Sequence, residues 1–342
     1  MRKLGTIECE ITSRCNLRCI HCYASAGEYQ PIDIPPNLVK SWMDQLLEFQ
    51  PYAFDIVGGE PFLYPYLWEV LEHAKSIGLP VILNTNATTI NHETVTTLKS
   101  CNPDVSIAVS LDGPNDTIND TIRGKGSFNK AMKGVELFLT KDFPVLFMFI
   151  VNRLNWRVFD KYVELAIREG VQEIYVDRFI GVGRGHKHLH FLDMELKQWC
   201  EALKIINEVV QAYKPKIEFY VEESITGGEC TAGRSHFSIG WDCIVVPCGH
   251  FKYYKPFHLG NAATEPLKTI FDRGNKLMQT NPTKCQQCIK FGKQCGAGCK
   301  GAALAMTGSP NNPDPIICAY FLGPGKQTDA FLPNQHLLKK TN

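Results

Sequence analysis

The sequence predicts an α/β protein in which six βα units form a partial barrel and a small cysteine-rich domain follows. Short β-branched runs alternate with longer helical runs, an alternation that indicates a parallel sheet with right-handed crossovers. The run 145–151 is continuously apolar, and 105–109 is apolar except for Ser106, as strands covered by helices are. From residue 217 the chain becomes rich in Gly, Pro and Cys instead. Because there are six units and a closed barrel has eight, we expect an open (β/α)6 TIM-like barrel.

The elements of the barrel follow from these runs in chain order. The predicted strands are short and β-branched, and they span residues 6–12, 53–57, 80–84, 105–111, 145–151 and 173–179. The predicted helices carry apolar residues at helical spacing, and they span residues 37–49, 64–77, 92–99, 128–141, 156–169 and 192–213. Pro35 and Pro36 precede the first helix, and Gly78 ends the second.

The last third of the chain has a different pattern. Short strands are expected at 216–221 and 244–247, but the segment has too few apolar runs to build a large core alone. Metal clusters would supply the missing cohesion, as they do in small metallo-domains. We therefore expect a barrel over residues 1–215, a cysteine-rich domain over 216–322 and a tail over 323–342.

Composition excludes several classes of protein. The 342 residues are 44% hydrophobic and carry a formal charge of +1, which gives no electrostatic case for binding nucleic acid or a membrane surface. The longest apolar stretch, 143–151, is far shorter than the roughly 18 residues that cross a bilayer. The N-terminus lacks the apolar segment of a secretory signal. We expect a soluble, cytoplasmic protein.

The 14 cysteines are the unusual feature of the composition. In a reducing compartment, clustered cysteines are more often metal ligands or redox groups than disulfides. Three of them lie between residues 15 and 22, and eight lie between 230 and 318. Cys9, Cys101 and Cys200 lie in strand and helix contexts, where a small buried apolar residue is the default.

The first cysteine group follows the first strand directly. Cys15, Cys19 and Cys22 place three thiolates in one short loop, at the end of a barrel strand where catalytic residues are usually found. Zinc sites and ordinary iron–sulfur clusters take four ligands, so one position is left for another group. The spacing resembles the C-x3-C-x-aromatic-C signature of the radical S-adenosylmethionine (SAM) superfamily, with His21 at the aromatic position. The alternative is a zinc loop that takes His21 as its fourth ligand.

That resemblance implies a cofactor set and a type of chemistry. Cys15, Cys19 and Cys22 would bind a [4Fe–4S] cluster whose fourth iron is chelated by the amino and carboxylate groups of SAM. Reductive cleavage of SAM would give methionine and a 5′-deoxyadenosyl radical that abstracts hydrogen from the substrate. The protein would bind and orient these groups and exclude water.

The same resemblance extends to the ends of the next strands. Gly58-Gly59-Glu60-Pro61 resembles the GGEP motif that receives the SAM ammonium, and glycines allow a close backbone approach. Asn84-Thr85-Asn86 is similar to the family's T-N-G. The segment from Ser110-Leu-Asp112-Gly113 to Arg123-Gly124 resembles one in which serine and arginine bind the SAM carboxylate. The implied SAM-binding residues are Gly58, Gly59, Glu60, Asn86, Ser110, Asp112, Arg123 and Asn152. Asp112 could instead be only structural, and Asn152 only a turn residue.

The second cysteine group resembles the SPASM extension of these enzymes, which binds two auxiliary [4Fe–4S] clusters. The resemblance assigns the second auxiliary cluster to Cys285, Cys288, Cys295 and Cys318. It assigns the first to Cys230, Cys248 and Cys299, with Cys243 as a fourth ligand or as a bystander that leaves an iron open. The chain departs from the family pattern because Cys243 replaces a glycine and one gap is six residues long where five are expected. The alternative for the region is a pair of zinc ribbons.

The function implied is a radical SAM/SPASM oxidoreductase, most often a maturase of ribosomally synthesised peptides (RiPPs). Related enzymes place a catalytic aspartate where this chain has Gly249-His250, so His250 or Tyr253 is the candidate catalytic residue. The alternative is modification of a small molecule, such as a tetrapyrrole side chain or a sugar or aminocyclitol. A non-catalytic electron carrier is a further alternative, which the SAM-pocket residues argue against. Expected partners are an electron donor such as flavodoxin or ferredoxin and a separate leader-peptide-binding protein.

Overall fold

A ten-stranded sheet organises the residues that the computed structural model describes, 3–28 and 30–324. The strand order is β10-β9-β8-β1-β2-β3-β4-β5-β6-β7. All neighbours from β8 to β7 are parallel, and β8, β9 and β10 form an antiparallel edge. The first six strands are Thr6–Thr12 (β1), Ala53–Gly58 (β2), Val81–Thr85 (β3), Ser106–Ser110 (β4), Val145–Val151 (β5) and Glu173–Arg178 (β6).

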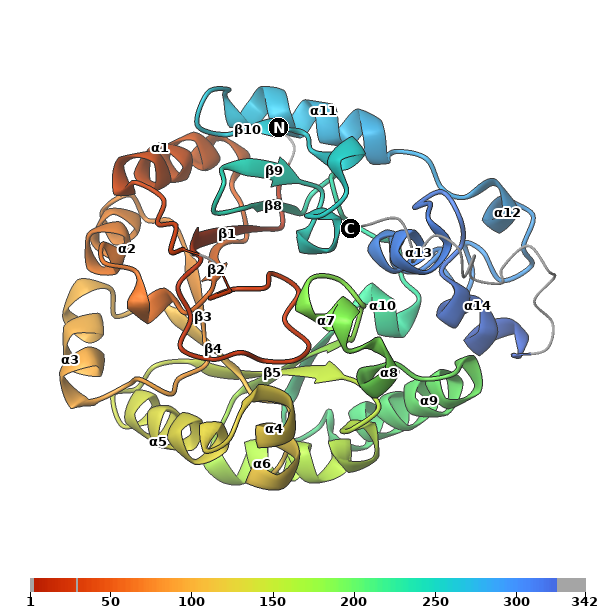
Figure 1. The fold of residues 1–342 in the computed structure, drawn as a ribbon, viewed down its shortest axis with the longest axis horizontal. Coiled ribbons are helices and arrows are strands. Elements are labelled where there is room, and N and C mark those ends of the chain that lie inside the picture. The colour runs from red at the N-terminus through yellow and green to blue at the C-terminus, as the bar shows by residue number, and fades with distance from the viewer. Residues whose placement is uncertain (1–2, 29, 325–342) are drawn as a thin grey trace.

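The predicted partial barrel of six βα units is confirmed. Its helices are Pro36–Leu46 (α1), Leu67–Ser76 (α2), His92–Cys101 (α3), Ser127–Leu139 (α5), Phe159–Glu169 (α6) and Leu196–Tyr213 (α9). Figure 1 shows these helices as an outer ring around the curved sheet. Aromatic side chains such as Phe147, Phe149 and Tyr162 fill the layer between β5 and α6, where they are fully buried. Burial of such large apolar surfaces stabilises the barrel wall.

Two helical regions differ from the sequence prediction. The helix predicted at 192–213 begins only at Leu196 (α9), and a separate short helix, Leu189–Leu192 (α8), precedes it. Between them the Asp193 carboxylate accepts hydrogen bonds from Met194 N and Trp199 Nε1 and so competes with helical backbone hydrogen bonds. Asp116–Arg123 (α4) was not predicted, since its eight residues include only two apolar ones. The Asn115 side chain begins α4 by accepting a hydrogen bond from Ile118 N at 3.1 Å.

The cysteine-rich segment extends both ends of the same sheet. Glu218–Val221 (β7) pairs with β6, and Phe237–Ile239 (β8) pairs with β1. The strands predicted at 216–221 and 244–247 are thus present as β7 and Ile244–Val246 (β9), whereas β8 and Gly260–Asn261 (β10) were not predicted. The helices of this part are Glu223–Thr226 (α10), Leu267–Met278 (α11), Thr283–Gln286 (α12), Lys300–Thr307 (α13) and Pro315–Leu322 (α14). Of the predicted tail, residues 325–342 lie outside the described residues.

The parallel strands all end on one side of the barrel, and that side carries the candidate site. The long loop after β1 crosses the open centre of the barrel in Figure 1, close to the short helix Arg184–Lys187 (α7). The Gly27 amide donates a hydrogen bond to Ser13 O just after β1, and the Ile34 amide donates one to Ile11 O within β1. These two bonds fix the loop against the strand. In the described part of the chain, no helix is long and apolar enough to cross a membrane.

Candidate active site

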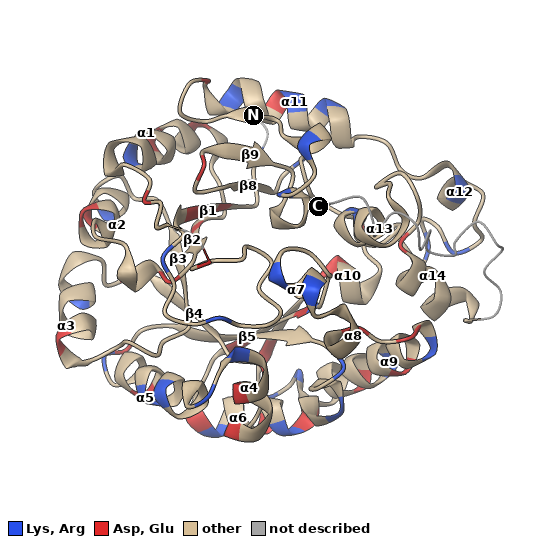
Figure 2. Cartoon of the chain, in the orientation of Figure 1, with Lys and Arg blue, Asp and Glu red and all other residues tan. Residues whose placement is uncertain are grey.

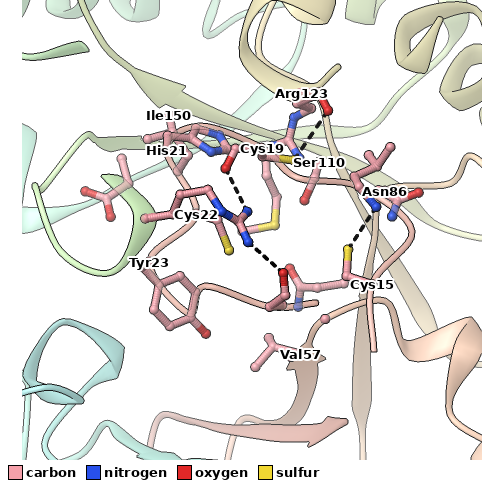
Figure 3. A pocket seen from close by; sticks show the side chains of 18 of the residues that line it. Cys15, Cys19, His21, Cys22, Tyr23, Val57, Asn86, Ser110, Arg123 and Ile150 are labelled. Atoms are coloured by element: carbon pink, nitrogen blue, oxygen red, sulfur yellow. Dashed lines mark hydrogen bonds between the residues drawn. The ribbon is translucent and has the colours of Figure 1, made fainter. Parts of the chain in front are cut away.

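A cavity of about 230 Å³ lies where the carboxyl ends of the parallel strands meet. Its walls combine the loop after β1 with residues from the ends of the next five strands. The lining residues that this subsection uses are Cys15, Cys19, His21, Cys22, Gly58, Gly59, Asn86, Ser110, Arg123, Arg184 and His250. Figure 3 shows the three cysteines, His21 and Arg123 turned toward this space. Side chains far apart in the sequence therefore share one concave site.

The three cysteine thiols of the loop after β1 lie near one another at this cavity. Leu17 N approaches Cys15 Sγ at 3.4 Å, and Arg184 holds the loop by donating to Cys19 O at 3.0 Å and Ala26 O at 2.7 Å. Burial raises the pKa of Cys15 to about 11 and that of Cys19 to about 12. A buried thiol ionises only when positive charge is supplied, and bound iron supplies it. The three thiols therefore fit an iron–sulfur cluster at this loop.

The two glycines at the end of β2 allow the backbone to pass directly beside that loop. A Cβ atom on Gly59 would lie 1.8 Å from Arg14 O, and one on Gly58 would lie 2.6 Å from Thr12 O. Gly58 also has a φ of +127°, which side-chain-bearing residues rarely adopt. The Gly59 and Glu60 amides donate to Thr12 O and Arg14 O at 2.8 and 2.6 Å. Glycine at both positions therefore sets the geometry of the cavity floor.

Glu60 is buried beside the cavity, and its carboxylate joins the ends of two strands. Oε1 accepts from the Thr85 hydroxyl at 2.7 Å, and Oε2 accepts from Asn86 N at 2.8 Å. Burial raises the pKa of Glu60 to about 7. Asn86 lines the cavity, and its amide donates to Asn16 Oδ1 at 2.9 Å. Glu60 thus positions Asn86 and the loop after β3.

Asp112 connects two cavity residues from behind the wall. Its fully buried carboxylate lies 2.6 Å from His21 Nε2 and 2.7 Å from Arg123 Nε. Burial alone would raise the pKa of Asp112, but the charges of Arg123 and then His21 outweigh it and lower the pKa to about 2. The ionised Asp112 therefore holds His21 and Arg123 toward the cavity, where Ser110 also lies.

Asn152 has a local structural contact with its own turn. Its side chain donates to Ile150 O at 2.9 Å and accepts from Leu154 N at 3.0 Å, and the residue is completely buried. It does not appear in the cavity lining among the described residues. These contacts shape the turn after β5.

The later cysteines form two groups. Cys285, Cys288, Cys295 and Cys318 lie close enough to influence one another's ionisation. Cys230 and Cys299 are joined by a hydrogen bond, and Cys248 lies beside them. Cys230 and Cys248 pack against the small core of Val246 and Phe251.

Cys243 is placed apart from this trio. It packs on the main core and lies near Cys9, in the turn that joins β8 to β9. Its N–H donates to Gly240 O, and its φ of +63° reflects that tight turn. The turn therefore directs the Cys243 thiol toward β1.

Comparisons with known proteins give the family. The model of the radical SAM superfamily matches residues 9–166, and the model of SPASM, an iron–sulfur cluster-binding domain, matches residues 230–295. The mycofactocin maturase MftC of Mycolicibacterium smegmatis is 33% identical over 322 residues, which cover 90% of this chain and 80% of the relative. The chain belongs to the radical SAM superfamily. It is an enzyme of the SPASM-containing type, with S-adenosylmethionine and iron–sulfur clusters as its cofactors.

Other similarities cover nearly the whole of this radical SAM enzyme. The AdoMet-dependent heme synthase of Methanosarcina barkeri is 29% identical over 349 residues, covering 93% of this chain and 96% of the relative. The crystal structure of Streptococcus suis SuiB bound to S-adenosylmethionine has a TM-score of 0.74 at 17% identity, covering 93% of this chain and 77% of that chain. The structure of anSMEcpe with bound AdoMet gives 0.75 at 17%, covering 94% of this chain and 95% of that chain. These two structures share the fold.

The two candidate catalytic residues lie in different surroundings. His250 lines the cavity of the radical SAM enzyme, and its Nδ1 is 3.9 Å from Cys248 Sγ. Tyr253 is 48% exposed and lies outside the lining that the structure describes. Burial of its hydroxyl raises the pKa of Tyr253 to about 12. The position of His250 between the cavity and Cys248 makes it the stronger candidate.

Sequence reasoning missed the charged residues that complete the cavity wall. The wall includes Glu8 from β1, Asp55 from β2 and Asp177 from β6. It also includes Arg178, at the end of β6, and Arg184, at the start of α7. The period-two pattern of each strand could have indicated that these residues face the barrel interior. Their partners could not be read from the pattern, since each arginine pairs with a carboxylate far away in the chain.

Proposed function

We propose that this enzyme generates a 5′-deoxyadenosyl radical from SAM and uses it to modify a ribosomally synthesised peptide by hydrogen abstraction. Similarity to the maturase MftC over 90% of the chain supports this function. The antilisterial bacteriocin subtilosin biosynthesis protein AlbA of Bacillus subtilis, 28% identical over 302 residues, adds support. The reaction class follows from the family, and the peptide substrate is argued from the charges of the cavity.

In this proposal the chain's own residues hold the cofactors in a fixed order around the cavity. Cys15, Cys19 and Cys22 bind the cluster that, with SAM, supplies the radical chemistry. Ser110 and Arg123 bind the SAM carboxylate, since an arginine fork suits that group. The backbone around Gly58 and Gly59 receives the SAM ammonium. Glu60 and Asp112 act as positioning residues, the first for Asn86 and the second for His21 and Arg123.

The observation that carries the peptide assignment is the charge balance of the cavity wall. Arg184 pairs with Glu28 at 2.6 Å and Arg178 pairs with Asp314, while Arg123, already paired with Asp112, is assigned to the SAM carboxylate. These carboxylates neutralise the arginines, so little positive charge remains to bind an anionic substrate.

Two carboxylates of the same wall are held by neutral donors. Asp55 accepts from the Asn84 amide, and Asp177 accepts from the Ser224 hydroxyl and from Arg178 N. Burial, and then the charge of Glu8, raise the pKa of Asp55 well above its usual value. Such groups favour N–H donors, which a peptide backbone or a basic side chain provides. Propionate groups of a tetrapyrrole would instead meet the negative charge of Glu8, which lines the same cavity and whose pKa is lowered by the charge of His236 despite burial.

We propose two auxiliary [4Fe–4S] clusters, which with the SAM cluster make three. Cys230, Cys248 and Cys299 contribute to the first, and Cys285, Cys288, Cys295 and Cys318 bind the second. The placement of Cys243 near Cys9 favours the bystander role for Cys243. His250, beside Cys248 at the cavity, is proposed to contact the substrate. Tyr253 remains the second candidate catalytic residue, and an electron donor and a separate leader-peptide-binding protein remain proposed partners.

Action on a tetrapyrrole is the second candidate function. It is favoured by the heme synthase relative, which matches over 96% of its own length. The two candidates are separated by incubating reconstituted enzyme, SAM and dithionite with synthetic peptides or with iron-coproporphyrin, and measuring 5′-deoxyadenosine and product masses. The peptide proposal expects mass changes in peptides alone. A modified porphyrin with unchanged peptides would replace it with the second candidate.

A further inference from the structure

The segment that carries the last cysteine contains a single charged residue. Between residues 301 and 325 the sequence has no Lys, Arg, His or Glu, and its only Asp is Asp314. Figure 2 accordingly shows α14, which carries Cys318, in tan. The Asp314 side chain is completely buried at the start of this helix. A buried charge is costly unless it is paired and hydrogen-bonded, so this carboxylate needs specific partners.

The two oxygens of the Asp314 carboxylate join three parts of the chain. Oδ1 accepts hydrogen bonds from the Ile316 and Ile317 amides at 3.1 and 3.4 Å and so caps α14. Oδ2 accepts one from Cys299 N, just before α13, at 3.2 Å. Oδ2 also accepts one from the guanidinium of Arg178, which is fully buried at the end of β6. One carboxylate therefore connects the barrel wall to α14 and to the start of α13.

Asp314 also lies between the two groups of later cysteines. We call Cys230, Cys248 and Cys299 the first group, and Cys285, Cys288, Cys295 and Cys318 the second group. The Asp314 carboxylate contacts Cys299 N of the first group and caps the helix that carries Cys318 of the second. A Cβ atom on Gly298 would lie 2.9 Å from Asp314 Cβ, so the loop before Cys299 passes beside the carboxylate. Burial, and then nearby negative groups that include Asp314, raise the pKa of Cys285 and of Cys318 to about 12.

Arg178 extends this connection to the cavity. It lines the cavity from the end of β6, beside Asp177. Among the described residues, Asp314 is the one carboxylate that pairs with its guanidinium. The same guanidinium lies 5.8 Å from the ring of Trp199 in α9. Because a guanidinium stays protonated in proteins, the pair holds one positive and one negative charge between the cavity and the later cysteines.

A charge pair at this place matters for clusters bound by the two cysteine groups. Reduction of an iron–sulfur cluster adds one negative charge, and its reduction potential depends on the net charge around it. The charges of Arg178 and Asp314 balance each other in the wild type. Without Asp314, the positive charge of Arg178 would favour the reduced clusters. Without Arg178, the negative charge of Asp314 would favour the oxidised clusters, and burial strengthens both effects.

We propose that Arg178 and Asp314 form a positioning pair that holds the cavity wall against both later cysteine groups and sets the reduction potentials of the two clusters bound there. The pair acts through its charge balance, so replacing either partner alone shifts both potentials, and the two replacements shift them in opposite directions. A purely structural contact would give no such opposition of sign. This inference rests on the two auxiliary clusters of the proposed function.

The potentials can be measured on the reconstituted holoenzyme by anaerobic redox titration followed by electron paramagnetic resonance, with the iron content of each variant determined in parallel. Addition of SAM alters the signal of the SAM cluster and so separates it from the auxiliary signals. The variants are Asp314→Asn, Arg178→Met and the two together. The matched control carries Glu69→Gln and Lys40→Met, which removes an ion pair of 2.6 Å between α2 and α1. Figure 1 shows α1 and α2 on the side of the barrel away from α13 and α14.

At the wild-type midpoint potential, the ratio of reduced to oxidised auxiliary cluster should rise by at least about threefold in Asp314→Asn and fall by at least about threefold in Arg178→Met. The double variant should return toward the wild-type ratio, and the SAM cluster and the control should not change. Shifts of the same sign in both single variants, or no shift with iron content intact, would overturn the proposal.

A single variant with an unpaired buried charge could lose iron, and the double variant covers this case because it leaves no such charge. It must keep its iron and the wild-type potentials, and Arg178→Lys, which retains the positive charge, must also keep potentials close to wild type. Loss of iron in the double variant would show a role in assembly alone and would overturn the proposal. Absence of auxiliary signals from iron-replete wild type would instead contradict the proposed function.

Discussion

Replacing Asp112 with Asn tests the buried ion pairs that hold His21 and Arg123 at the cavity. The neighbouring charges lower the pKa of Asp112 from 3.8 to about 2 despite burial, which alone would raise it. At 1.36 kcal/mol for each pH unit, this difference corresponds to about 2 kcal/mol of folding free energy at neutral pH. The Asn side chain has nearly the same shape but no charge, so the variant should lose about that amount.

The pH dependence gives the sign of the effect. Because the folded pKa lies below the unfolded one, the stabilisation is present above about pH 4 and is lost as the pH falls through about 2. Urea unfolding of the apoprotein, followed by circular dichroism at pH 7 and pH 3, measures it. Asp104→Asn, at an exposed position, is the control and should change stability by less than about 0.5 kcal/mol. An Asp112→Asn variant as stable as wild type at pH 7, or a deficit that is unchanged at pH 3, would refute the reasoning.

The remaining predictions concern the cavity floor, the clusters and the acidic wall. Burial raises the pKa of Glu60 from 4.5 to about 7. The stability that this group contributes is therefore present below about pH 4.5 and is lost as the pH rises through 7. Glu60→Gln should remove that part of the pH dependence in the same unfolding assay. Gly59→Ala places a Cβ atom 1.8 Å from Arg14 O and should weaken SAM binding by at least tenfold in calorimetry. Unchanged affinity would show that the close approach of Gly59 to Arg14 does not constrain the loop after β1. Cys243→Ala should keep the iron content of wild type whereas Cys248→Ala should lose up to four irons per chain; equal losses would assign Cys243 as a ligand. Asp55→Asn and Asp177→Asn should raise KM for the peptide substrate several-fold with SAM affinity unchanged, a split that a purely structural role would not produce.

The sequence predicted those features that depend on local pattern. The six strands and the Cys15, Cys19 and Cys22 loop could be located because apolar runs and cysteine spacing are local signals. The carboxylate of Glu60 could not be placed, since its contacts with Thr85 and Asn86 depend on how β2 and β3 align. A single sequence contains no direct measure of that alignment.

Long-range pairs were the second limit of the sequence analysis. Arg184 reaches Glu28 across 156 positions, and Arg178 reaches Asp314 across 136, so no motif could suggest either pair. The role of Cys243 was left open between fourth ligand and bystander, because the family pattern has a glycine at that position. In the structure the short turn between β8 and β9 places Cys243 near Cys9.

The most direct test of the account is the formation of 5′-deoxyadenosine by anaerobically reconstituted enzyme with SAM and dithionite. Host extract would be supplied as separate peptide and small-metabolite fractions, and the nucleoside would be followed by chromatography. The account predicts 5′-deoxyadenosine that is stimulated by the peptide fraction and abolished in Cys19→Ala. No 5′-deoxyadenosine under any condition, with iron content intact, would contradict it.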